Sequence, residues 1–161
     1  MKNLSGSILL SFVLFTSPAF AAEETPAENH IAVNVWGFSH HAQRNKGYNE
    51  QNWGLGVRAY HGNWFAAADE MRNSVRGNTF AYGIGYEYPL FTLKGFTASA
   101  VAEAVRVNYE FPGLGIARAT VILPGASVRK ENVSANLLYI PETSHRKSIV
   151  MLFGTYHFKG F

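Results

Sequence analysis

Apolar and polar residues alternate along eight short segments of the chain, and Gly, Pro or polar residues separate one segment from the next. The segments cover residues 31–39, 53–60, 63–71, 79–88, 94–106, 117–128, 133–140 and 148–158. A period of two predicts strands, and regularly spaced short strands indicate an all-β barrel or sandwich. The even strand number favours an eight-stranded, antiparallel, up-and-down barrel. Only residues 23–30 show a spacing that predicts a short helix.

The two faces of the predicted strands differ in bulk and polarity. In the fourth segment Phe80, Tyr82 and Ile84 alternate with Gly83 and Gly85. A soluble periplasmic sandwich would bury the bulky face and a transmembrane barrel would turn it toward lipid, so alternation alone is compatible with both. The aromatic residues that cluster near strand ends, as interfacial girdles do, favour the transmembrane barrel.

The first residues have the pattern of a secretory signal peptide. Lys2 precedes an apolar run over residues 8–15, and Ala19 and Ala21 match a small-x-small cleavage site. We therefore expect a signal peptide over residues 1–21 and a single outer-membrane barrel domain over residues 22–161. The chain has no cysteine, which excludes a disulfide framework, and residues 22–161 contain no apolar run of helical membrane-spanning length.

Charge and ligand spacing exclude several functions. The formal net charge of +3 is too small to indicate nucleic-acid binding. His40, His41 and the distant His145 lack a metal-ligand spacing, so we predict neither a metal nor another cofactor. The loops carry basic residues that would either meet lipopolysaccharide phosphates or remain as solvated charge: Arg44, Lys46, Arg72, Arg76, Arg146 and Lys147.

With both termini in the periplasm, the inner face would be aliphatic in its outer half, where Leu138 and Met151 lie, and polar in its periplasmic half. We expect Gly83 and Gly85 to leave a void there that holds a fatty acyl chain; the alternative is that they only balance bulky neighbours. Pro124 and Pro141 each remove a ladder donor from neighbouring strands. They predict a lateral gap for lipid entry, or else a bulge or strand end.

Strand parity brings the loops over residues 40–52, 72–78 and 141–147 to one end of the barrel. This end collects histidines, Ser74 and several amides and carboxylates. An imidazole and a hydroxyl at the same mouth are the minimum for acyl transfer, with an amide or carboxylate to orient the imidazole. Polar loops are also common at the ends of barrels that have no such activity.

Several short motifs resemble, in order, those of the outer-membrane lipid A palmitoyltransferases. They are "HA" at 41–42, "YNE" at 48–50, "WG" at 53–54, "GNW" at 62–64, "NS" at 73–74, "GIGYE" at 83–87, "LP-ASV" within 123–128 and "LYIP" at 138–141. The resemblance implies an eight-stranded barrel that moves a palmitoyl-like chain from a phospholipid to lipid A. It covers most of residues 22–161.

The resemblance also implies roles for individual residues. The family's essential His and Ser fall on His41 and Ser74, its chain-length glycine on Gly85, and its gate prolines on Pro124 and Pro141. The family's Asp falls on Asn73, a departure that leaves an orienting amide without a negative charge, unless Glu50 substitutes for it. The family's N-terminal amphipathic helix has little room in residues 22–30, and the first outer loop is shorter.

These observations predict an outer-membrane acyltransferase with a phospholipid acyl donor and a lipid A acceptor. His41 would be the general base, Asn73 its orienting residue and Ser74 the essential hydroxyl. Two alternatives are a non-catalytic lipid-binding or structural barrel and a lipid A deacylase.

Overall fold

The computed structural model describes residues 29–43, 46–142 and 147–158. The eight strands are β1 (His30–His41), β2 (Gln51–His61), β3 (Trp64–Arg72), β4 (Asn78–Leu93), β5 (Phe96–Phe111), β6 (Gly115–Lys130), β7 (Val133–Ile140) and β8 (Ile149–His157). Each predicted segment corresponds to one of these strands. The expected signal peptide and the helix over residues 23–30 fall almost entirely outside the described residues.

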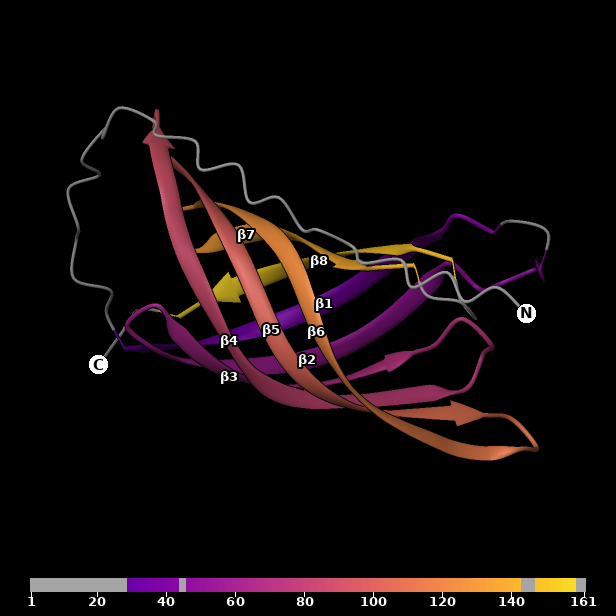
Figure 1. Cartoon of the computed structure of the whole chain (residues 1–161). Coiled ribbons are helices and arrows are strands. Elements are labelled where there is room, and N and C mark those ends of the chain that lie inside the picture. The colour runs from indigo at the N-terminus through magenta and orange to yellow at the C-terminus, as the bar shows by residue number, and fades with distance from the viewer. Residues whose placement is uncertain (1–28, 44–45, 143–146, 159–161) are drawn as a thin grey trace, which may run out of the picture.

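Each strand pairs antiparallel with its neighbours in sequence, and β1 also pairs with β8, so that the sheet closes into a barrel. This confirms the eight-stranded up-and-down barrel, and the alternative prediction of a sandwich is wrong. The start of β1 and the end of β8 lie at one end of the barrel (Figure 1). We call the opposite end, formed by the β1–β2, β3–β4, β5–β6 and β7–β8 connections, the rim.

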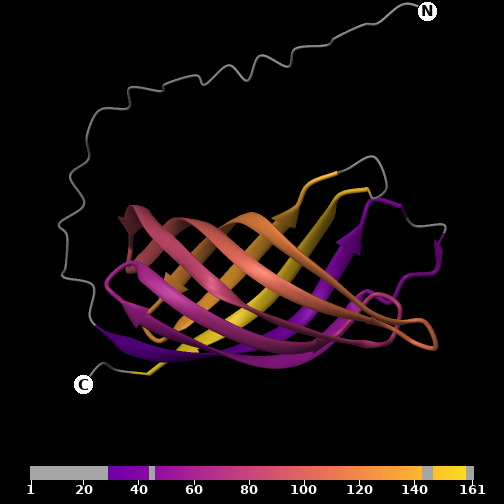
Figure 2. The same ribbon diagram turned by 60° about the horizontal axis from the view of Figure 1, so that its bottom comes forward.

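Strands β4, β5 and β6 each have 16 residues, more than their alternation predicted. The extra residues of β5 and β6 continue their pairing to Phe111 and Gly115, and this hairpin projects beyond the β3–β4 connection (Figure 2). At the other end Lys94 and Gly95 have positive φ angles of 50° and 79° and form the β4–β5 turn. The fifth strand therefore begins at Phe96 and not at the predicted residue 94.

The barrel is apolar outside and largely polar inside. Large side chains on the outward positions are exposed, among them Trp53 (58%), Leu55 (64%), Ile84 (58%) and Ile122 (72%). Among the described residues the buried set instead includes many polar side chains: Asn34, Ser39, His41, Asn52, Arg58, Asp69, Asn73, Thr79, Ser99, Glu103, Ser127, Ser134, Asn136, Thr155 and His157. Many exposed large apolar side chains together with many buried polar ones are not the distribution of a water-soluble domain, although apolar residues such as Trp36, Phe65 and Leu138 are buried too.

Hydrogen bonds connect the inner polar groups across strands. Asp69 accepts from Asn34 Nδ2 at 2.8 Å and from Trp36 Nε1 at 2.7 Å. Arg58 forms a buried ion pair with Glu103. Partners are required here, because an unpaired buried charge would destabilise the fold by several kcal/mol. Together these groups fill the middle of the lumen.

A bulge in β1 changes which side chains face the lumen. The register of β1 with both β2 and β8 shifts between Trp36 and Phe38, at Gly37. Trp36 is buried, the extra residue interrupts the alternation, and Phe38 then points outward. Ser39 and His41 consequently lie inside the barrel.

Candidate functional site

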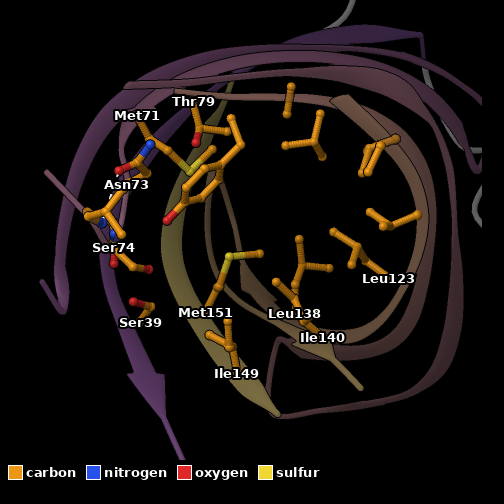
Figure 3. Close-up of a pocket in the computed structure, with 18 of the residues that line it drawn as sticks. Ser39, Met71, Asn73, Ser74, Thr79, Leu123, Leu138, Ile140, Ile149 and Met151 are labelled. Carbon is orange, nitrogen blue, oxygen red and sulfur yellow. Dashed lines mark hydrogen bonds between the residues drawn. The ribbon is translucent and has the colours of Figure 1, made fainter. Parts of the chain in front are cut away.

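A cavity of about 490 Å³ opens at the rim and extends into the lumen. Its wall is mainly aliphatic, while Ser39 and Ser74 lie across the opening from Leu123, Leu138 and Ile140 (Figure 3). Trp36, Asp69 and Glu103 also line it, so that the polar groups of the middle lumen close its floor. The volume lies within the range of small-ligand sites in proteins.

The cavity agrees with part of the predicted acyl site. Leu138 and Met151 line it, as expected of inner residues near the rim, and the lumen is aliphatic at this end and polar below. Leu138 and Met151 therefore lie at the cavity, and their binding of an acyl chain stays a prediction.

The predicted void at Gly83 and Gly85 needs correction. Neither glycine lines the cavity. A Cβ at Gly85 would lie 2.2 Å from the Phe65 ring, and a Cβ at Gly83 would lie 2.1 Å from the Ala104 carbonyl oxygen. The absent side chains thus admit an aromatic ring from β3 and the close approach of β5, and they leave no empty space.

The hydrogen-bond ladder between β6 and β7 is interrupted on the rim side. Their pairing runs from Lys130–Val133 to Gly125–Leu138 and stops there. Residues 115–124 of β6 pair only with β5, and Pro124 is the first β6 residue beyond the paired stretch. Pro141 follows the last residue of β7. The two prolines therefore flank an interruption of the ladder, as predicted from their missing N–H donors.

His41 and Ser74 meet at the rim end of the cavity. Ser74 Oγ lies 2.8 Å from His41 Nε2, and Ser39 Oγ lies 3.3 Å from the same nitrogen. Both hydroxyls donate when Nε2 is unprotonated, which fits a neutral imidazole with its proton on Nδ1. The ring of Tyr48 lies against the imidazole, with 4.6 Å between the ring centroids. An imidazole held in this way can accept a proton from a hydroxyl.

The loop between β3 and β4 is held by its neighbours, and this fixes Ser74. Asn49 from the β1–β2 connection donates its backbone N–H to the Ser74 carbonyl oxygen at 2.8 Å. Tyr109 of β5 forms hydrogen bonds with Ser74 and Val75. Contacts from the β1–β2 connection and from β5 therefore hold Ser74 in place.

Asn73 has a different role from the predicted orientation of His41. Its Nδ2 donates to the carbonyl oxygens of Asn78 (3.0 Å) and Glu110 (2.8 Å). Its Oδ1 accepts from the backbone N–H groups of Val75 (3.1 Å) and Gly77 (2.9 Å). The amide is thus used inside the β3–β4 loop, and Asn73 positions the residue next to it.

Glu50 supplies the negative charge near the imidazole. Its Oε1 accepts the backbone N–H of His41 at 3.1 Å. Burial lowers the pKa of His41 below its ordinary value of 6.5, the Glu50 carboxylate raises it, and His40 lowers it, with a net decrease. His41 lies beyond Phe38, the last apolar outward residue of β1. Because the pKa of His41 is lowered, its ring is neutral at pH 7 and can act as a base.

Sequence reasoning missed three residues around His41 and Ser74. Ser39 had no signal, because its inward direction depends on the Gly37 bulge. Tyr48 was placed at the rim but not against the imidazole, and Tyr109 lay beyond the predicted end of its strand. His145 and Arg44 lie outside the described residues, and within the described ranges no three His, Asp or Glu side chains form a metal-ligand group.

Comparisons with known proteins returned two solved structures of interest. The chain is similar to the N-terminal β-barrel domain of Pseudomonas aeruginosa OprF, with a TM-score of 0.49 and 15% identity over 81% of this chain and 98% of that one. It is also similar to the Yersinia pestis outer membrane protein Ail, with a TM-score of 0.46 and 13% identity over 81% of this chain and 100% of that one. No family model and no curated protein matches. The described part of the chain has no helix long and apolar enough to cross a membrane.

Proposed function

We propose that this chain is a barrel of the bacterial outer membrane that transfers a fatty acyl chain from a phospholipid to lipid A. The membrane location is supported by the outward surface, where exposed residues such as Trp53, Leu55, Trp64 and Ile84 would be unfavourable in water. In hydrocarbon the same residues form the apolar band of a spanning barrel, and closure of the sheet removes its edges.

The cavity supports an acyl chain as the ligand. Its wall contains the aliphatic side chains of Val105, Val121, Leu123, Leu138 and Ile140. Each CH₂ of a chain that leaves water for this wall contributes about 0.8 kcal/mol. The interrupted ladder between β6 and β7 supports entry of a chain from the side of the barrel, so that the chain need not leave the membrane.

The reaction proposed for His41 and Ser74 is transesterification. His41 Nε2 takes the proton of the attacking hydroxyl as its oxygen bonds to the ester carbonyl carbon of the phospholipid. The tetrahedral intermediate then breaks the bond to the glycerol oxygen, which receives the proton from His41 and leaves as lysophospholipid. If Ser74 is the first nucleophile, a lipid A hydroxyl repeats the cycle on the acyl-serine; if not, the lipid A hydroxyl attacks directly beside Ser74.

The observation that carries this proposal is the 2.8 Å contact between His41 Nε2 and Ser74 Oγ at the mouth of an aliphatic cavity. The test is mass spectrometry of lipid A from cells with and without the chain. Acyl transfer predicts a lipid A species heavier by one acyl group. A lighter species would indicate a deacylase, and unchanged lipid A a non-catalytic lipid-binding or structural barrel.

A further inference from the structure

Arg118 lies on the part of β6 that borders the proposed lateral opening. It belongs to the stretch that pairs with β5 only, it is exposed, and it lines the cavity. On this strand the outward positions run from Ile122, which is 72% exposed, through Thr120 and Arg118 to Ile116, which is 60% exposed. Arg118 thus places a cation four residues nearer the rim than the apolar side chain of Ile122.

Arg118 brings a positive charge that the neighbouring carboxylates do not neutralise. The ion pairs among the described residues do not include it. On the facing side of the opening, Lys147 is paired with Glu142. On β5 the carboxylate of Glu110 accepts the backbone N–H of Asn78 at 2.8 Å. Among the described residues that border the opening, Arg118 is therefore a cation without a carboxylate partner, and its guanidinium suits phosphate oxygens.

The guanidinium is also close in the fold to the reaction centre. Arg118 pairs with Asn108, and the adjacent Ala117 pairs with Tyr109. Tyr109 in turn forms hydrogen bonds with Ser74. One strand thus separates the residue that borders the opening from the hydroxyl at which the ester would react.

From this placement we propose that Arg118 binds the phosphate of the phospholipid acyl donor. This inference rests on the proposed function, which it makes more specific: the donor must carry an anionic phosphodiester. In a glycerophospholipid the ester and the phosphate are attached to the same three-carbon glycerol. An ester held at Ser74 and His41 therefore keeps its phosphate within a few bonds, in the region that Arg118 occupies at the edge of the opening.

The test compares two ligands with identical chains in the Ser74→Ala variant, which prevents turnover. Dipalmitoyl phosphatidylethanolamine carries the phosphate, whereas dipalmitoylglycerol does not. Binding of each is measured by native mass spectrometry in a nonionic detergent. We expect about a tenfold preference for the phospholipid, as for one charge-assisted contact. Adding Arg118→Gln should reduce the preference to below about twofold, and Arg118→Lys should restore part of it because the charge returns.

Arg106→Gln is the matched control. Arg106 is an outward arginine of β5 that donates to Thr120 Oγ1 at 3.1 Å, and its removal should leave the tenfold preference intact. Equal binding of the two ligands by the parent would overturn the assignment, as would a preference that survives Arg118→Gln.

A third arm uses purified lipid A, which also carries phosphates. If Arg118→Gln weakens lipid A binding but not phospholipid binding, Arg118 serves the acceptor and the assignment to the donor is wrong. The arms also separate this inference from the proposed function. A preference for the phospholipid without acyl transfer in cells would support the Arg118 site and overturn the proposed acyl transfer. Acyl transfer in cells without that preference would support the proposed function and overturn the Arg118 site.

Discussion

Ser74 Oγ and His41 Nε2 lie 2.8 Å apart, although 33 positions separate the two residues in the sequence. The contact joins the end of β1 to the β3–β4 loop, across the width of β2. Barrel closure alone does not produce it. It requires the inward direction of His41 and the attachment of the Ser74 carbonyl to Asn49.

Replacing Ser74 by Ala should reduce acyl transfer by about 10²- to 10⁴-fold, the range for loss of a group that acts with a general base. Purified variant and parent are compared by the rate of acyl addition to lipid A in detergent micelles. The barrel should remain folded, because the Ser74 carbonyl contact with Asn49 is kept; heat-modifiable mobility on electrophoresis checks this. Transfer at the parental rate would exclude Ser74 from the reaction.

The pH dependence of transfer should report His41. The neutral ring is the active form, so kcat/KM decreases as the pH falls through its pKa. Burial lowers this pKa below 6.5, hence the half-maximal point should lie below pH 6.5. Glu50→Gln removes the carboxylate that raises the pKa and should move that point to a still lower pH. A pH profile with its acid limb at or above 6.5 would contradict the assignment.

Asn73→Asp introduces the Asp that the lipid A palmitoyltransferases have at this position, but we expect it to lower the stability of the fold. The carboxylate can still accept from Val75 and Gly77, whereas it cannot donate to the carbonyl oxygens of Asn78 and Glu110. Two part-buried acceptors that lose their donor should lower the free energy of unfolding by about 1–3 kcal/mol. Urea unfolding of the variant in micelles measures this. Increased stability together with faster transfer would return Asn73 to an orienting role.

Acyl-chain length should depend on Ala81 and not on Gly85. Ala81 is buried and lines the cavity, so Ala81→Met fills space that a chain would occupy and should select a shorter donor chain. Gly85→Met is the matched comparison, since it meets the Phe65 ring outside the cavity. It should cost about 1–3 kcal/mol of stability and leave the length of the transferred chain unchanged. Mass spectra of lipid A distinguish the two, and a shorter chain with Gly85→Met would reinstate that glycine as the floor.

Alternation was sufficient to predict the barrel and the polarity of its lumen. Residues such as Leu138 and Met151 were placed correctly because their direction follows from strand parity and their height from strand order. Pro124 and Pro141 predicted the interrupted ladder for a related reason: a proline has no N–H donor, whatever its surroundings in the fold.

The chemistry of single residues was less predictable, because it depends on contacts between distant strands. A glycine such as Gly85 leaves either a void or room for a neighbour, and only the position of Phe65 decides between them. An amide such as Asn73 can orient an imidazole or hold a loop, and the carbonyl of Glu110, 37 positions away, determines which. Sequence spacing contains neither fact.

The extra residue at Gly37 has a consequence for how proteins of this kind are compared. If the same residues continued in strict alternation from Trp36 without the bulge, His40 would face the lumen and His41 would face outward. Removing Gly37 would instead keep Phe38 outward and Ser39 and His41 inward, because the bulge accommodates one residue more than the alternation needs. When two such barrels are aligned, the direction of each side chain in the first strand must therefore be counted from the bulge and not from the start of the strand.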